Sequence, residues 1–121
     1  MIPKTVIETL EKIEYLIIDQ ELEVESIDPQ TKILKGEILF IDGFQFHFME
    51  YTGQQTHDYR FHYTDDDENL IRRWDNAPHH QELKNFPFHV HTSEEVKSSK
   101  EFTFPEIVKK VETLIIERIE E

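Results

Sequence analysis

The chain has 121 residues, no cysteine and a formal net charge of −13 at pH 7. This length predicts a single domain, residues 1–121, whose core needs no disulfide or metal. The lack of cysteine excludes thiolate catalysis and cysteine-ligated zinc, and it is typical of proteins in a reducing cytoplasm. The acidic charge argues against a broad, non-specific nucleic-acid binder. Because screening confines charge effects to about 10 Å, a small cationic pocket is still compatible with it.

The sequence shows no sign of membrane insertion or export. No apolar run approaches the roughly 18 to 20 residues that cross a bilayer. The N-terminal segment also lacks the basic start and apolar block of a secretory signal. We therefore expect a cytoplasmic protein with no membrane partner.

The first half of the chain predicts a short helix followed by three strands. Apolar residues at helical spacing after Pro3 indicate the helix, and near alternation of apolar and charged residues indicates the first strand. Asp42-Gly43 is typical of a tight hairpin turn between the next two strands. The predicted helix covers residues 3–13, and the strands cover residues 16–27, 32–41 and 44–51.

A two-residue loop at Asp42-Gly43 would set the register of this hairpin. It would pair Leu39 with Phe46 and Ile38 with His47. One face of the hairpin would then be apolar near the turn and charged at its far end, at Glu50. We expect this charged end to face the functional part of the chain.

The second half predicts two more strands and a closing helix. Residues 57–64 alternate and residues 70–75 form the next strand, which Pro78 prevents from continuing. An ordered loop is expected from there to Thr92. Thr103 and Glu106 form a capping box that begins an amphipathic helix. The fold class is therefore α+β: an antiparallel meander of about five strands, with a short N-terminal helix and the C-terminal helix packed on the sheet.

Residues 57–91 carry the chemistry of this chain. They hold six of the seven histidines, and the pairs His79-His80 and His89-x-His91 stand out. Alternate residues of an extended segment lie on one face, so His89 and His91 could address one centre. Histidine can act as both acid and base, and arginine can stabilise a phosphoryl group. Metal-independent cleavage of a phosphodiester by these histidines with Arg60 and Arg73 is one interpretation.

Two other interpretations stay open. His79, His80, His89 and His91, with Asp75 and Glu50, could hold a divalent metal such as zinc, nickel or manganese, although no known zinc spacing is matched. The histidines could also simply hold a loop together, with Asp75 paired to a strand arginine. Trp74 and the Phe/Tyr stripe of residues 59–63 are expected in the core.

The central stretch resembles a known family. The order Y-x-F-H-Y, an acidic turn, LIRRWDNAPHH and NFP-x-H-x-H resembles the TumE-type toxin family, and the resemblance covers most of the chain. The matching signature residues here are Tyr59, Arg73, Asp75, Asn76, Pro78, His79, His80, Pro87, His89 and His91. The family usually reads FPHHKH where this chain reads FPFHVH, so Phe88 and Val90 depart from its pattern.

The resemblance implies the toxin of a toxin–antitoxin pair, with a helix-turn-helix antitoxin as partner. We expect a ribonuclease or another translation-directed toxin with an RNA substrate and no cofactor. His79, His80, His89, His91 and Asp75 would be catalytic, and Arg60, Arg73, Tyr59 and Asn76 would bind substrate. The alternative is a non-enzymatic module that docks a basic DNA-binding partner through its acidic surface and histidine-rich loop. A homodimer is also expected, because the sheet edges need covering.

Overall fold

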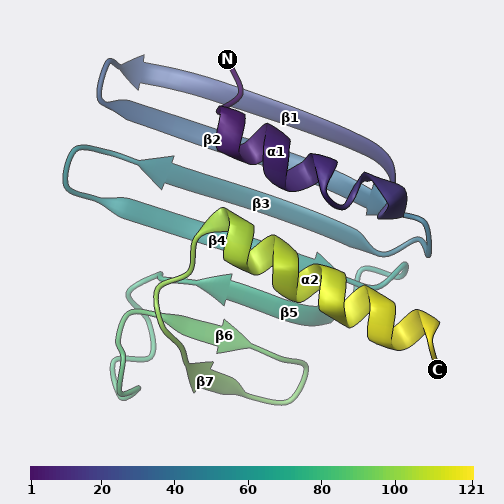
Figure 1. The fold of residues 1–121 in the computed structure, drawn as a ribbon. Coiled ribbons are helices and arrows are strands. Elements are labelled where there is room, and N and C mark those ends of the chain that lie inside the picture. The colour runs from purple at the N-terminus through teal and green to yellow at the C-terminus, as the bar shows by residue number, and fades with distance from the viewer.

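The computed structural model describes residues 1–121 and contains one seven-stranded antiparallel sheet with two helices (Figure 1). Each strand pairs with its neighbour in sequence, so the order across the sheet is β1-β2-β3-β4-β5-β6-β7. The strands are β1 (Ile17–Asp28), β2 (Thr31–Phe40), β3 (Gln45–Thr52), β4 (His57–Thr64), β5 (Leu70–Asp75), β6 (His89–His91) and β7 (Val96–Ser98). The helices are α1 (Lys4–Glu11) and α2 (Phe104–Ile119), with a 3-10 turn at Glu14–Leu16 after α1.

Both helices cover the same face of the sheet, and Figure 1 shows α1 over the β1 side and α2 over the middle strands. The alternation of the strands explains this arrangement, because every second side chain of β2, β3 and β4 is buried under the helices. The core joins these strand residues to α2, for example where Phe48 contacts Phe104 with ring centroids 4.9 Å apart. The opposite face of the sheet carries no helix, and we call it the open face.

The predicted capping box of α2 is confirmed. The Thr103 hydroxyl accepts the backbone N–H of Glu106, while the Glu106 carboxylate accepts the backbone N–H of Thr103. This pair satisfies two of the backbone donors that a helix start leaves free. It fixes where α2 begins and so how its apolar stripe meets the sheet. Trp74 and the Tyr59-Phe61-Tyr63 stripe are buried in the core, also as predicted.

The predicted register of the β2–β3 hairpin is wrong by one residue. Ile38 pairs with Phe46, and Leu39 pairs with Gln45. The turn holds three residues instead of two, since Gly43 adopts a left-handed φ of 86° and Phe40 N–H donates to the carbonyl of Phe44. The observed register lets Phe46 join the core beside Ile38, and burial of those side chains decides it.

Glu50 shares its face of β3 with Phe46 and Phe48. This residue lies on the helix-covered face, where its carboxylate contacts His57 Nε2 at 2.6 Å. Glu50 thus contacts the stretch of residues 57–91 at His57, as expected, but it lies on the other face of the sheet from His89 and His91 and cannot join them in a metal site.

The sheet has seven strands where about five were predicted, because β6 and β7 lie in or after the segment expected as a loop. Each has three residues, too few for a periodic pattern to be read.

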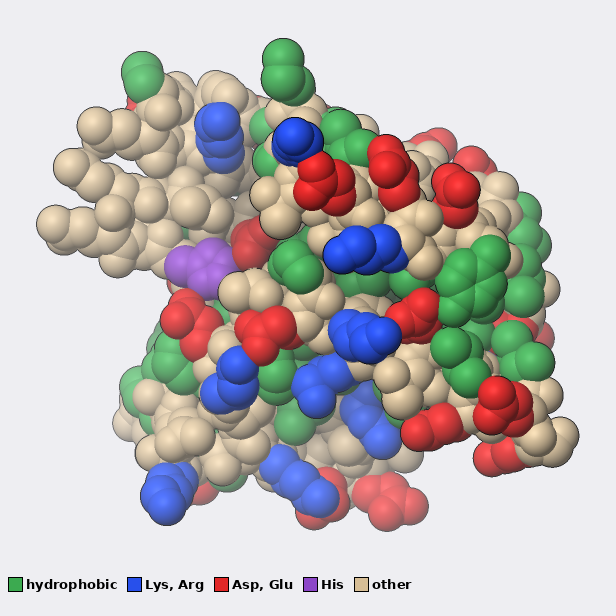
Figure 2. Space-filling view, viewed as in Figure 1, with side chains coloured by type: hydrophobic (Ala, Val, Ile, Leu, Met, Phe, Trp, Pro, Cys, Tyr) green, Lys and Arg blue, Asp and Glu red, His purple; other side chains and the backbone are tan.

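No helix of the structure is long and apolar enough to span a membrane. Almost no histidine surface appears on the helix-bearing face (Figure 2).

Candidate functional site

Two rows of side chains cross the open face from β2 to β6, one residue per strand. The first row runs Glu37, His47, His62, Arg73, His91, and the second runs Lys35, Met49, Arg60, Asp75, His89. Directly paired residues of antiparallel strands project to the same face, so each row is contiguous. The strand pairing thus brings β5 and β6, which are separated by the 76–88 loop, together at one place.

Asp75 is the centre of this place. Its carboxylate is almost completely buried and contacts three side chains: Oδ1 lies 2.7 Å from His89 Nε2, while Oδ2 lies 3.2 Å from Arg73 Nε and 3.5 Å from His91 Nε2. Oδ1 also accepts the backbone N–H of Ala77, which fixes the turn after β5. A buried carboxylate needs such partners, because an unpaired charge in the interior is strongly destabilising.

His89 is held from both sides. Its side chain is 1% exposed, with Nδ1 2.7 Å from the carbonyl oxygen of Pro87 and Nε2 facing Asp75. Both neighbours of the ring are acceptors. The ring is therefore fixed between β6 and the end of β5 and is not free to turn into the open face.

His91 differs from His89 because one of its ring nitrogens faces a hydrogen-bond donor. Arg73 Nη2 lies 3.3 Å from His91 Nε2, and since a guanidinium can only donate, Nε2 accepts and the neutral ring carries its hydrogen on Nδ1. Burial and then the Arg73 charge lower the pKa of His91 to about 4, against a smaller opposing effect of Asp75. The open face thus presents a neutral imidazole beside a fixed cation.

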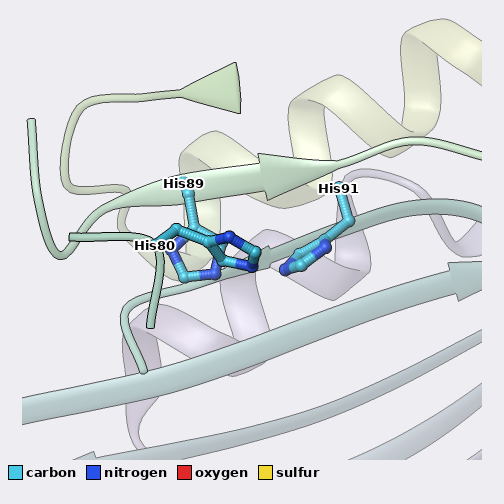
Figure 3. Close-up of side chains that lie close together, drawn as sticks. All are labelled: His80, His89 and His91. Atoms are coloured by element: carbon cyan, nitrogen blue, oxygen red, sulfur yellow. The ribbon is translucent and has the colours of Figure 1, made fainter. Parts of the chain in front are cut away.

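His80 completes a cluster of three rings (Figure 3). Its ring centroid lies 5.3 Å from that of His89 and 5.5 Å from that of His91. The backbone of His80 has a φ of 58°, in the left-handed region, and this bend turns the ring back toward β6. We call His80, His89 and His91 the histidine cluster. His79 is exposed beside it.

A cavity of about 610 Å³ opens over the histidine cluster, and we call it the site cavity. Arg60, Arg73, Asp75 and His79 line it together with the cluster. Arg60 makes no ion pair with any carboxylate, although it lies across from Asp75 in the strand register. Its guanidinium is therefore available to an anionic ligand. The volume lies within the usual range of ligand sites.

Two residues predicted to bind substrate have other roles. Tyr59 points to the helix-covered face, is 3% exposed, and accepts the backbone N–H of Phe102 at its hydroxyl. Asn76 uses its amide to continue strand pairing past the end of β5: Oδ1 accepts from Tyr59 N–H and Nδ2 donates to the carbonyl of His57. Both residues also line the site cavity, so their assignment to substrate binding stays a prediction.

The sequence reasoning missed how far the site extends. His62 appeared only as one of several histidines, and His47 was assigned to a hairpin face in the wrong register. In the structure they occupy adjacent positions of one row, next to Arg73. Burial, followed by the charges of Arg73, His47 and Arg60, lowers the pKa of His62. The alternation of residues 57–64 already placed His62 on the face of Arg60, and the pairing of β3 with β4 would have added His47.

The histidine cluster approaches the spacing of a metal site without matching it well. The candidate nitrogens of His80, His89 and His91 lie within 4.8 Å of one another. However, both nitrogens of His89 are bound to protein acceptors, and the Arg73 cation touches His91 Nε2. A fixed positive charge at the centre opposes a divalent cation there. The donor set therefore fits an anion better than a metal.

Taken together, the fold and the site define a small α+β domain with a histidine, arginine and aspartate cluster on its open face. The chain matches the family model described as Toxin TumE over residues 4–121, and it belongs to this family. It is accordingly a toxin of a toxin–antitoxin system, which implies an antitoxin partner. No significant match is found among curated proteins or among solved structures.

Proposed function

We propose that this toxin is a metal-independent ribonuclease whose active site is the histidine cluster with Arg60, Arg73 and Asp75. The observation that carries the proposal is the neutral His91 beside Arg73 in an open cavity, with His80 5.5 Å away between ring centroids. Such a set offers a proton acceptor, a second titratable ring and a fixed charge for the phosphoryl group.

His91 would act as the general base. Its Nε2 is unprotonated and accepts from the Arg73 guanidinium, with Asp75 Oδ2 3.5 Å away. A phosphate entering the cavity would draw Arg73 toward its own oxygens and free Nε2. The negative charge of the phosphate would also raise the pKa of His91 toward the working pH, where a base is most effective.

His80 would act as the general acid. It is partly exposed at the cavity and its ring faces His91, whereas His89 is too buried to reach a substrate. His91 would take the proton from a ribose 2′-hydroxyl as its oxygen attacks the adjacent phosphorus. The bond from phosphorus to O5′ would break as His80 gives its proton to that oxygen. The products would be a 2′,3′-cyclic phosphate and a 5′-hydroxyl, and His79 at the cavity mouth is the second candidate for the acid.

Asp75 and His89 would be positioning residues. Asp75 accepts from Arg73 Nε and so aims the two outer nitrogens of the guanidinium into the cavity. His89 contacts Oδ1 of the same carboxylate from β6 and so holds Asp75 in place beside Arg73 and His91. Arg60 would supply the second phosphate contact from β4.

The test is incubation of the purified protein with total RNA in the presence of a chelator. We expect cleavage by the wild type that leaves cyclic phosphate ends, and loss of about 100-fold or more in rate for His91→Gln and His80→Gln. His57→Gln is the matched control, because His57 lies on the helix-covered face. Circular dichroism verifies that each variant is folded.

Unchanged cleavage in both folded site variants would overturn the assignment. Cleavage that the chelator abolishes and Zn²⁺ or Mn²⁺ restores would favour the metal interpretation of the same cluster. Growth arrest in cells gives an independent readout, since arrest should be relieved by the same two substitutions and persist with His57→Gln.

A second candidate is a binding module without catalysis that docks a basic helix-turn-helix antitoxin. The observation in its favour is the row of carboxylates along β1, where Asp19, Glu21, Glu23 and Glu25 lie on the open face without basic partners. This surface would attract a basic protein. Growth arrest that survives substitution of the entire histidine cluster, with no RNA cleavage, would select this function.

A further inference from the structure

A second concavity of about 880 Å³ lies on the open face between β1 and β4, and we call it the open-face groove. It shares Met49 and Arg60 with the site cavity, so the two hollows adjoin at these residues. Lys35, His47 and His62 line its floor on the other side of that junction. A ligand longer than one nucleotide would run from one hollow into the other.

We propose that the open-face groove binds the RNA segment next to the cleaved phosphate and accepts a single strand only. The inference rests on the proposed ribonuclease function and adds the substrate class and the residues that hold it. These residues are Lys35, His47 and His62, with Arg60 at the junction.

The first argument is the unmatched positive charge in the groove. Lys35 and Arg60 make no ion pair with any carboxylate in a chain whose net charge is −13. In the strand pairing, Lys35 lies on one side of Met49 and Arg60 on the other. Lys35 lies opposite Glu23 in the β1–β2 register without forming an ion pair with it, so both cations remain available to phosphate groups, which prefer such partners.

The second argument is distance. Adjacent strands lie about 4.8 Å apart, so β4 is about 10 Å and β3 about 14 Å from the histidines on β6. This span is too long for one phosphate to bridge. His62 and His47 would therefore contact the neighbouring nucleotide, which leaves the acid–base chemistry to the histidine cluster.

The third argument is the acidic wall that limits the groove. Glu21 and Glu23 on β1 and Glu37 on β2 line the side opposite Arg60. This wall would repel a second phosphate backbone, since like charges in a half-enclosed groove repel strongly. A single strand would follow Lys35 and Arg60, whereas a duplex would bring its second backbone against these carboxylates.

The experiment measures binding by fluorescence anisotropy with a 2′-O-methyl decanucleotide, whose blocked hydroxyl prevents cleavage. We expect the wild type to bind the single strand more tightly than the same strand annealed to its complement. Lys35→Gln and His62→Gln should each weaken single-strand binding about three- to tenfold. For Lys35→Gln, the slope of log affinity against log salt should also fall by about 0.7.

Lys4→Gln is the matched control, because it removes the same charge from α1 on the opposite face. Its affinity should equal that of the wild type. In RNA cleavage, the two groove variants should raise KM while changing kcat by less than about twofold, in contrast to His91→Gln. Melting curves confirm that both groove variants are folded.

The outcomes separate the two proposals. Wild-type affinity in both groove variants, or tighter binding of the duplex, overturns the groove. If these variants also cleave RNA with an unchanged KM, the ribonuclease function stands without it. A wild type that neither binds the oligonucleotide nor cleaves RNA overturns both.

Discussion

Asp75 Oδ1 lies 2.7 Å from Nε2 of His89, and this contact joins the end of β5 to β6 across the loop of residues 76–88. Neither residue is exposed enough to meet a substrate. The contact nevertheless shapes the surface that a substrate would bind, because it fixes the carboxylate that holds Arg73 and faces His91.

The first prediction concerns this carboxylate. Asp75→Asn removes the negative charge that faces Arg73 and His89, while keeping the size of the side chain. We expect a loss of about 3 kcal/mol in the free energy of unfolding and loss of toxicity. Urea denaturation measures the first and growth arrest the second. Asp67→Asn, in the exposed turn, is the control and should change neither quantity. If Asp75→Asn also left stability and growth arrest unchanged, Asp75 would not be the centre of the site.

The second prediction concerns acid stability at His91. The pKa of this residue is lowered to about 4, first by burial and then by Arg73, whereas an unfolded histidine titrates near 6.5. Between these values the unfolded state binds more protons, so stability falls as pH falls through this window. We expect wild type to lose about 2 kcal/mol relative to His91→Gln between pH 6.5 and pH 4. Parallel pH profiles of the two proteins would contradict the lowered pKa.

The third prediction concerns His57, whose pKa is shifted in the opposite direction to that of His91. Burial acts to lower the pKa of His57, but hydrogen bonds to Glu101 and Glu50 outweigh it and raise that pKa above 6.5. Its contribution is therefore complete below the unfolded pKa and is lost as pH rises through the folded value. The stability difference between wild type and His57→Gln should be at most about 1 kcal/mol near pH 6 and should vanish near pH 9. Melting temperatures at the two pH values measure it, and a difference that grows toward pH 9 would be inconsistent with the raised pKa.

The fourth prediction concerns the packing under the sheet. A Cβ at Gly36 would lie 2.3 Å from the Phe48 ring and 2.9 Å from Leu22 Cδ2. Gly36→Ala must therefore displace core side chains, and we expect a loss of about 1 to 3 kcal/mol in urea denaturation. Lys35→Ala, the adjacent position on the open face, serves as control and should cost less than about 0.5 kcal/mol. Equal stability of the two variants would contradict the packing of Phe48.

The strands that could be predicted from sequence are those with enough alternation to define two faces. Residues 57–64 and 70–75 have the predicted bounds, and the alternation correctly separates Arg60 and His62 from the Tyr59 stripe. The hairpin register could not be predicted from Asp42-Gly43, because this dipeptide suits both a two-residue and a three-residue loop. Only the burial of Phe46 beside Ile38 distinguishes them.

The site was predictable in part. The spacing of His89 and His91 predicted one shared face, and β6 confirms it. The partners of Asp75 depend on which strand pairs with β5, and three residues of β6 give no signal for that pairing. The structural contacts of Tyr59 and Asn76 were missed for the same reason. A motif shows that residues occur together, but not which face of the sheet each one occupies.

The sequential strand order has a consequence for how the protein forms. Each strand pairs with its immediate neighbour in the chain, so each new pairing needs only the strand that follows. The β1–β4 part can assemble one hairpin after another as it is synthesised, but its apolar face stays uncovered until α2 follows β7. Asp75 likewise meets His89 only once the 76–88 loop has been made. We therefore expect the nascent chain to gain its toxicity late, when the sheet is closed and the covering helix has docked.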